Sequence, residues 1–348
     1  MNDAIRITRD APLQSRNSFG VRARAPMLVE VADAGALPQV LQRPELSDGI
    51  ALVLGGGSNL LFAGDPAGVV LALAGRRTTV VPGSDNDDGA IVRADAGVIW
   101  HELVLRTLDI GLSGLENLAL IPGTAGAAPI QNIGAYGVEV CDYIHAVEAF
   151  EPATGKLHRL DRDACRFAYR DSLFKQQPDR YIVTAVEFAL PRSPRLKLDY
   201  AGIGEQLDAE GITAPTPRDV ADAVIAIRRR KLPDPDRLGN AGSFFKNPIV
   251  PATQADALLA EHPALPAFRG NDAHSRKLSA AWLIDACGWK GHRDGDAGVA
   301  ASHALVLVNH GHASGQQLLD LARRIAESVH ARFGVALEPE PRVIGASW

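Results

Sequence analysis

The first 75 residues alternate between two patterns of apolar positions. Apolar runs at 28–33, 50–55 and 68–75 have the length and composition of β-strands, while Leu37, Val40 and Leu41 recur at helical spacing between the first two runs. Glycines form the turn that follows the run at 50–55. This order predicts a small α/β unit with a glycine-rich turn after its central strand.

Residues 76–211 carry a different mixture of elements. The apolar positions predict a hairpin over 78–94, a helix over about 100–108 that ends near Gly111, and strands over 146–160 and 181–190, the first turning at Gly155. Between the helix and these strands, residues 114–137 are rich in small side chains and show neither helical nor strand spacing. The region therefore predicts an α+β arrangement.

Two helices are expected in the last third of the chain. The first begins after the cap residue Thr216 and ends by Leu232, because prolines follow it. The second opens with a capping pattern at Ser314 and closes at Gly334. We expect residues 216–335 to form a third region, of α/β type.

Composition narrows the class of protein. A chain of 348 residues with 46% apolar and 22% charged residues is long enough for two or three globular domains. Its 36 Lys and Arg against 41 Asp and Glu give a net charge of −5, which argues against nucleic-acid binding. Cys141, Cys165 and Cys287 form no CxxC pair, and the chain shows neither a secretory signal nor a membrane-spanning apolar run. We expect a cytoplasmic protein without membrane insertion.

Two segments of small residues are candidates for anion binding. Gly55, Gly56, Gly57, Ser58 and Asn59 follow an apolar strand and could surround a phosphate with N–H groups, although a structural turn is the alternative. This loop matches neither GxGxxG nor a Walker motif. Residues 121–129, IPGTAGAAP, form the second segment, for which a tightly packed turn is the alternative. Together the two segments favour a long, flat ligand that contains a pyrophosphate.

Three further positions carry charged or reactive side chains. Arg170, between an aromatic residue and an acid, could bind a carboxylate or a flavin carbonyl, or form a surface ion pair. The run RRRK at 228–231 suits the end of a helix, and phosphate binding is the alternative. Ser243 follows a glycine and precedes two phenylalanines without a GxSxG motif, which favours proton donation over acyl transfer.

Other polar residues favour an ordinary surface role when taken alone. Glu340 lies in a stiff, proline-containing segment close to the C-terminus, where solvent exposure is the simplest interpretation. His310 and His312 have no third metal ligand nearby, which favours a polar loop over a metal site.

Six segments together resemble the UDP-N-acetylenolpyruvoylglucosamine reductase (MurB) family in its longer, type I form. They occur in the family's order and spacing between Asn17 and about Ser347: GGGSNLLF, GLENLALIPGTAGAAPIQNIGAYG, CRFAYRDSLFK, RRRKLPDP, GNAGSFFKNP and LEPEPRVIGAS. The resemblance implies an α+β, three-domain FAD-binding fold of the vanillyl-alcohol oxidase/MurB type with a separate α/β substrate-binding domain. The expected domains are FAD-binding subdomain 1 at 1–75, FAD-binding subdomain 2 at 76–215 and the substrate-binding domain at 216–335, with the tail 336–348 returning near the first.

The resemblance also implies roles for individual residues. Ser243 would be the proton donor, with Arg170 and Glu340 as its catalytic partners. FAD, bound non-covalently, would be contacted by Gly55, Gly56, Gly57, Ser58, Asn59, Ile121, Pro122, Gly123, Thr124, Gly126, Ala127, Ile133, Gly137 and Arg342. The substrate would be contacted by Tyr136, Tyr200, Arg228, Lys231 and Asn247. No metal site is expected.

The implied reaction is the NADPH-dependent reduction of UDP-N-acetylglucosamine enolpyruvate to UDP-N-acetylmuramate, for peptidoglycan synthesis, by a cytoplasmic monomer. Hydride would pass from NADPH through the flavin to the enolpyruvyl β-carbon. Arg170 would stabilise the developing negative charge, and Ser243 would protonate the α-carbon. The alternatives are another FAD-dependent oxidase or dehydrogenase of the same fold, and a non-catalytic nucleotide-sugar binding protein.

One residue departs from the family pattern. Arg293, in KGHRDG, stands where the family commonly has a polar neutral residue. It is expected either to contact the diphosphate or to face Asp294 or Asp296.

Overall fold

The structure, a computed structural model, describes residues 5–200, 202–270 and 272–348. These residues group into two compact units that interleave along the sequence. Unit 1 comprises the residues up to Ala11, Ala25–Gly57 and Pro66–Arg230, and unit 2 comprises Pro12–Arg24, Ser58–Asp65 and Lys231–Trp348. The domain boundaries at 75, 215 and 335 stay predictions.

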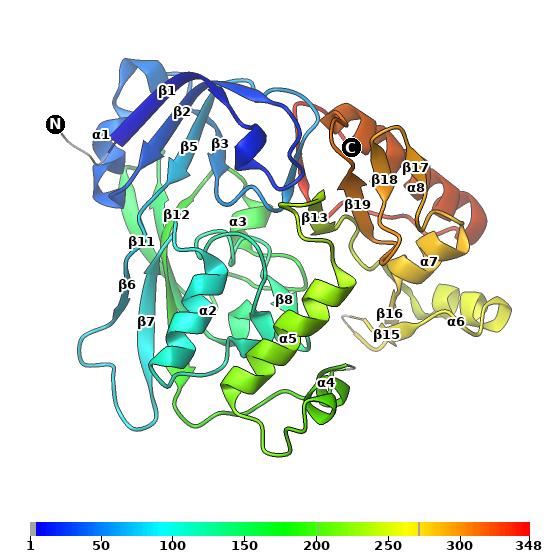
Figure 1. Cartoon of the computed structure of the whole chain (residues 1–348). Coiled ribbons are helices and arrows are strands. Elements are labelled where there is room, and N and C mark those ends of the chain that lie inside the picture. The colour runs from blue at the N-terminus through cyan, green and yellow to red at the C-terminus, as the bar shows by residue number, and fades with distance from the viewer. Residues whose placement is uncertain (1–4, 201, 271) are drawn as a thin grey trace. The chain divides into compact units, whose positions relative to one another are not determined.

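The N-terminal part of unit 1 forms a four-stranded sheet in the order β1-β2-β5-β3 (Figure 1). Its strands are β1 (Ile5–Pro12), β2 (Arg24–Val31), β3 (Ile50–Leu54) and β5 (Val69–Leu73), and helix α1 (Leu37–Leu41) follows β2. Since β2 and β3 both run parallel to β5, the carboxyl ends of these three strands lie at one edge of the sheet. The predicted α/β unit is confirmed. β1 was not predicted, because it is an edge strand with one buried residue, Ala11.

The second sheet of unit 1 has the order β11-β10-β12-β7-β6 and is antiparallel. Its strands are β6 (Thr78–Val80), β7 (Gly89–Asp95), β10 (Ile144–Glu151), β11 (Lys156–Asp161) and β12 (Ile182–Pro191). The central strand β12 is buried at eight of its ten residues. The predicted hairpin at 78–94 and the strands at 146–160 and 181–190 are confirmed.

Two helices of unit 1 lie side by side (Figure 1). They are α2 (Trp100–Asp109) and α5 (Pro217–Lys231), and Arg218 of α5 donates a hydrogen bond to Asp109 of α2. Gly111, with φ of +75°, follows α2, and Thr216 precedes α5, as the sequence predicts. The shorter helices of unit 1 are α3 (Leu173–Gln176) and α4 (Ile203–Ala209), and its shortest strands are β8 (Gly134–Ala135) and β9 (Val138–Glu139).

Unit 2 contains two further sheets, with the orders β13-β19-β18-β17 and β14-β16-β15. Their strands are β13 (Gly239–Ser243), β14 (Ile249–Pro251), β15 (Ala267–Arg269), β16 (Ser275–Leu278), β17 (Arg293–Asp294), β18 (Ala297–Val299) and β19 (Val306–Asn309), and the helices are α6 (Ala252–Glu261), α7 (Ala280–Ala286) and α8 (Gly315–Phe333). Helix α8 packs against β18 and β19 (Figure 1). The predicted start of α8 after Ser314 and its end at Gly334 are confirmed.

The C-terminal segment pairs with a strand from early in the sequence. Strand β20 (Arg342–Ile344) runs parallel to β4 (Leu60–Phe62), which follows the glycine-rich turn. Within the described part of the chain, every helix is too short or too polar to cross a membrane.

Candidate functional site

The two predicted cofactor segments lie against each other within unit 1. A Cβ on Gly56 would stand 2.7 Å from the Cα of Gly123, and a Cβ on Gly55 would stand 3.0 Å from Oγ1 of Thr124 and 3.3 Å from the Cβ of Ala127. Backbone this close tolerates only glycine at residue 56. We call residues 55–57 together with 123–127 the glycine cradle. Its exposed surface is largely main chain, which fits the backbone binding of a pyrophosphate such as that of FAD.

The N-terminus of α2 holds the segment that leads into the glycine cradle. Trp100 donates its backbone N–H to the Gly123 carbonyl at 3.0 Å and its indole N–H to the Leu118 carbonyl at 2.9 Å. The backbone N–H of Leu120 donates to Nδ1 of His101 at 3.1 Å, and Leu120 has the uncommon φ of +57°. Three hydrogen bonds therefore determine the path of this segment.

The bond to Leu120 also determines the protonation of His101. A backbone N–H can only donate, so Nδ1 must carry a lone pair and the ring must be neutral. Burial, and then the nearby Arg229, lower the pKa of His101 and favour that neutral form. The sequence analysis did not single out Trp100 or His101, and the only local signal was their position at a helix N-terminus.

Other residues predicted to bind the cofactor pack around the same segment. A Cβ on Gly126 would stand 2.5 Å from the Cβ of Ala96, and the Gly126 N–H donates to the Ala96 carbonyl at 3.0 Å. Ile121 and Ile133 are partly buried against the hydrophobic core of unit 1, and Pro122 lies between Ile121 and Gly123. These residues support the path of the backbone.

Ser58 and Asn59, the rest of the glycine-rich turn, belong to unit 2. The side-chain amide of Asn59 donates to the Glu340 carbonyl at 3.3 Å, and the N–H of Arg342 donates to the Asn59 carbonyl at 3.1 Å. Three predicted residues from two distant segments, Asn59, Glu340 and Arg342, are thus brought together.

Ser243 lies at the end of β13, opposite Val306 of β19. The chain after it runs alongside the Glu340 segment, since the Glu340 N–H donates to the Phe244 carbonyl at 2.7 Å and the Lys246 N–H donates to the Glu338 carbonyl at 3.0 Å. Both phenylalanines are buried, whereas Ser243 is partly exposed. Unit 2 therefore places Ser243 and Glu340 on neighbouring stretches of backbone, as their predicted partnership requires.

Arg170 lies in unit 1, in a tight turn closed by hydrogen bonds between Ala168 and Asp171. Its guanidinium donates to the Gly134 carbonyl at 2.8 Å, and its φ is +53°. Asn132, which is fully buried, donates to the Ala168 carbonyl at 3.1 Å. These backbone contacts orient the Arg170 side chain, as a predicted anion-stabilising group requires.

Three of the predicted substrate residues gather in unit 1. The rings of Tyr136 and Tyr200 make an edge contact at 5.3 Å, and Arg228 of α5 acts electrostatically on Tyr136. Burial raises the pKa of Tyr136 and lowers that of Arg228, whose Nε is buried without a hydrogen-bond partner among the described residues. Gly137, predicted for the cofactor, lies beside this pair, because a Cβ on it would stand 4.0 Å from that of Tyr200.

The other two predicted substrate residues are in unit 2. Lys231 is an exposed residue at the end of α5, and its carbonyl accepts a hydrogen bond from Ser302 at 3.1 Å. Asn247 accepts the N–H of Ala280, at the start of α7, at 3.0 Å. The carbonyl oxygen of the Asn247 side chain is therefore bound to backbone, which fixes the direction of its NH2 group.

Arg293 faces an acid of its own loop. It lies 3.2 Å from the Asp296 carboxylate and donates to the Gly295 carbonyl at 2.8 Å, which confirms the second of its two expected arrangements. Asp296 also accepts the N–H of His312. Within the described ranges, no group of three or more His, Cys, Asp and Glu side chains could hold a metal ion.

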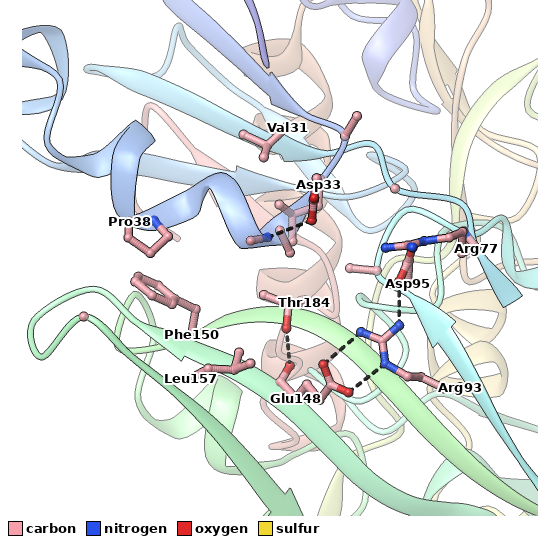
Figure 2. A pocket seen from close by; sticks show the side chains of 17 residues that line it. Val31, Asp33, Pro38, Arg77, Arg93, Asp95, Glu148, Phe150, Leu157 and Thr184 are labelled. Atoms are coloured by element: carbon pink, nitrogen blue, oxygen red, sulfur yellow. Dashed lines mark hydrogen bonds and ion pairs between the residues drawn. The ribbon is translucent and has the colours of Figure 1, made fainter. Parts of the chain in front are cut away.

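Unit 1 also contains a cavity of about 260 Å³ beside the carboxyl ends of β2 and β5 (Figure 2). Arg93 donates to both oxygens of Glu148, at 2.7 and 2.9 Å, and to Asp95 at 2.7 Å. Arg77 also lies 3.5 Å from Asp95, so two guanidinium groups pair with the two carboxylates. The residues that line the cavity include none of the predicted site residues.

The chain matches two family profiles and is similar to known proteins along nearly its whole length. The profile of a family described as "FAD binding domain" matches residues 26–161, and that of "UDP-N-acetylenolpyruvoylglucosamine reductase, C-terminal domain" matches residues 234–344. The chain is 58% identical to the UDP-N-acetylenolpyruvoylglucosamine reductase of Xanthomonas euvesicatoria pv. vesicatoria (strain 85-10) over 352 residues, with 100% of both sequences covered. It is 57% identical to that of Xylella fastidiosa (strain M12) over 339 residues, with 97% of this chain and 96% of the relative covered.

A solved structure is similar along nearly the whole chain. The UDP-N-acetylenolpyruvylglucosamine reductase (MurB) from Thermus caldophilus superimposes with a TM-score of 0.66 at 28% identity, with 97% of this chain and 99% of that one covered. The predicted fold class, α+β of the vanillyl-alcohol oxidase/MurB type, is confirmed.

Proposed function

The chain belongs to the UDP-N-acetylenolpyruvoylglucosamine reductase family, and we propose that it reduces UDP-N-acetylglucosamine enolpyruvate to UDP-N-acetylmuramate for peptidoglycan synthesis. It is an FAD-dependent oxidoreductase, and NADPH is the proposed reductant. The observation that carries the proposal is the glycine cradle, where Gly56 and Gly123 approach so closely that side chains are excluded. The sequence identity along the full chain supports it independently.

The cofactor-binding role belongs to backbone and small side chains. Bound FAD would supply the hydride-transfer chemistry between the reductant and the substrate. The cradle residues Gly55, Gly56, Gly57, Gly123, Thr124, Gly126 and Ala127 would bind the pyrophosphate region through their N–H groups. We assign Ser58, Asn59, Ile121, Pro122, Ile133, Gly137 and Arg342 to the same cofactor. Trp100 and His101 hold the backbone at Leu118 and Leu120, in the segment that leads into the cradle.

Three side chains would carry the chemistry on the substrate. Hydride addition to the β-carbon of the enolpyruvyl group places negative charge on the α-carbon and its carboxylate, and Arg170 would stabilise that charge. Ser243 would donate its hydroxyl proton to the α-carbon. Because a serine hydroxyl is a weak acid, it must lie close to a strongly basic carbon. Glu340, on the backbone stretch beside Phe244, would orient this donor.

Substrate binding would involve cations and aromatic rings. Arg228 and Lys231 would bind the diphosphate or carboxylate, while Tyr136, Tyr200 and the NH2 group of Asn247 would complete the contacts. Arg228 supports this assignment, because its Nε is buried without a hydrogen-bond partner in the described part of the chain. We also propose a cytoplasmic monomer with two FAD-binding subdomains and a substrate-binding domain.

Product analysis tests the proposal. The purified protein, NADPH and UDP-N-acetylglucosamine enolpyruvate should yield NADP⁺ and, in equal amount, a product two hydrogens heavier than the substrate. UDP-N-acetylglucosamine, which lacks the enolpyruvyl group, serves as the control and should not be consumed. A yellow protein that consumes oxygen but leaves the enolpyruvyl compound unchanged would be another flavin oxidase. A colourless protein that only binds the nucleotide sugar would be a binding protein.

A further inference from the structure

Asn117 joins two segments that carry proposed substrate residues. Its side-chain nitrogen, Nδ2, donates to the Tyr136 carbonyl at 2.9 Å and to the Lys197 carbonyl at 2.9 Å. These acceptors lie 19 and 80 residues further along the chain. Asn117 is itself 1% exposed. A single buried NH2 group therefore uses both of its hydrogens to connect two distant stretches of unit 1.

The first acceptor belongs to a residue with uncommon backbone geometry. Tyr136 has a φ of +50°, in the left-handed region that a bulky aromatic residue rarely adopts. Such a conformation persists where its surroundings hold it, and strained residues cluster at functional sites. The hydrogen bond from Asn117 to the carbonyl of this residue is one interaction that holds it.

The second acceptor precedes the other tyrosine. Lys197 lies three residues before Tyr200, and residues 194–199 form neither helix nor strand. Tyr200 is 50% exposed, although its ring packs against Tyr136 at 5.3 Å. Because no helix or strand fixes this segment, the hydrogen bond from Asn117 to the Lys197 carbonyl holds its backbone three residues before Tyr200.

We propose that Asn117 is a positioning residue that sets the Tyr136–Tyr200 pair for binding the diphosphate of the nucleotide-sugar substrate. It does so by holding both backbone segments with one amide. The inference rests on the proposed function and extends it to a residue that would not touch the substrate. Arg228, whose charge acts on Tyr136, gives this part of unit 1 the positive charge that a diphosphate requires.

Asn117→Asp is the direct test, because it keeps the shape and replaces the NH2 group, with both of its donors, by one carboxylate oxygen that faces the two carbonyls. We expect a KM for the enolpyruvyl substrate and a Kd for UDP raised about 10-fold or more, since two buried hydrogen bonds are lost. The kcat and the FAD content should change less than about threefold, as fits a role in binding rather than in chemistry.

A double-mutant cycle with Tyr200→Ala separates positioning from a merely structural role. If Asn117 acts through Tyr200, Asn117→Asp should raise KM only about twofold or less once Tyr200 has been removed. The inference would be overturned if Asn117→Asp raised KM equally with and without Tyr200. It would also be overturned if a folded, FAD-loaded Asn117→Asp protein had an unchanged KM. If Asn117→Asp does not fold, Asn117→Ser, which keeps one donor, takes its place in the same cycle.

Asn240 offers a matched control in unit 2. It is 4% exposed, and its Nδ2 donates to the carbonyls of Pro233 and Leu238 at 3.0 and 2.8 Å. Asn240→Asp should therefore cost similar thermal stability, but any effect on KM should be the same with and without Tyr200. The wild-type assay separates a failure of the proposed function from a failure of the role of Asn117. An inactive wild type refutes the proposed function, whereas an active wild type with an additive cycle refutes only the role of Asn117.

Discussion

The glycine cradle of unit 1 and the Ser243 segment of unit 2, residues 243–247, differ in whether main chain or side chain has the functional role. In the cradle the main chain is the binding surface, and side chains such as Trp100 and His101 only hold it. In the Ser243 segment the main chain is the support, paired with β19 and with the Glu340 segment, and a side chain would do the chemistry. Substitutions should therefore impair cofactor binding in the first region and turnover in the second.

The largest effect should come from Ser243→Ala. Loss of a general acid typically costs 10²- to 10⁴-fold, so we expect the reoxidation of reduced flavin by the enolpyruvyl substrate to slow about 10³-fold. Stopped-flow absorbance measures this half-reaction separately from the reduction of the flavin by NADPH, which should stay within about twofold. Ser113→Ala, which removes a buried hydroxyl bound to Pro191 at 3.0 Å, is a control for the general cost of a lost hydroxyl. Fast reoxidation in Ser243→Ala would remove Ser243 from the mechanism.

Gly56→Ala should act on the cofactor instead. Its Cβ would stand 2.7 Å from the Cα of Gly123, so the cradle must open. We expect FAD affinity to fall about 100-fold, in line with the 1–3 kcal/mol cost of overpacking, with the upper end favoured because backbone moves. The ratio of flavin to protein absorbance after gel filtration reports the loss. Gly204→Ala in α4, where a Cβ meets nothing within 4 Å, should retain its FAD.

His101 should give a smaller, pH-dependent effect on the same region. Because burial lowers its pKa below the usual value, its stabilising contribution is complete above about pH 6.5 and is lost as the pH falls towards the lowered pKa. A protonated Nδ1 cannot accept from Leu120, so FAD release and thermal unfolding should become easier in that acid range. His101→Asn keeps a neutral acceptor and should show a flatter pH profile.

Several charged groups act on this titration. Arg229, Arg218 and Arg228 of α5 favour the neutral ring, and Glu102 of α2 opposes them. The FAD Kd is measured by fluorescence titration between pH 5 and 8 in both proteins. Identical profiles for wild type and His101→Asn would show that His101 does not titrate in this role.

The smallest predicted effect concerns Lys231. This exposed cation should contribute to anion binding, so Lys231→Ala is expected to raise KM about 5- to 10-fold with little change in kcat and to weaken the salt dependence of KM. Arg323→Ala, which removes a partly exposed cation of α8 paired with Asp320, should leave KM unchanged. If Lys231→Ala has the same KM as wild type, Lys231 does not bind the substrate and is only a helix-terminal cation.

Features of the two regions that leave a local signal in the sequence could be predicted. The glycines of the cradle, the caps of α5 and α8 and the apolar run of β12 are local signals, and the structure confirms the elements that they predict. The close approach of Gly56 to Gly123 agrees with the single ligand expected for two separate small-residue segments.

Residues that act through distant hydrogen bonds could not be found in this way. Asn117 bonds to residues 19 and 80 positions away, and His101 bonds to Leu120, so neither leaves a periodic or spaced pattern. The edge strand β1 gives a weak pattern for a different reason, since it has one buried residue and its Ile5 and Ile7 pack only partly buried against the core. Sequence patterns thus report local conformation and burial, while long-range polar contacts require the fold.

The most direct test of the central claim is an anaerobic two-step titration of the wild-type protein followed at the flavin absorbance near 450 nm. NADPH should bleach the flavin, and one equivalent of UDP-N-acetylglucosamine enolpyruvate should restore the absorbance in the absence of oxygen. UDP-N-acetylglucosamine should leave the flavin bleached. The proposed reductase activity would be contradicted if the flavin stayed bleached with the enolpyruvyl substrate and recovered its colour only when oxygen was admitted.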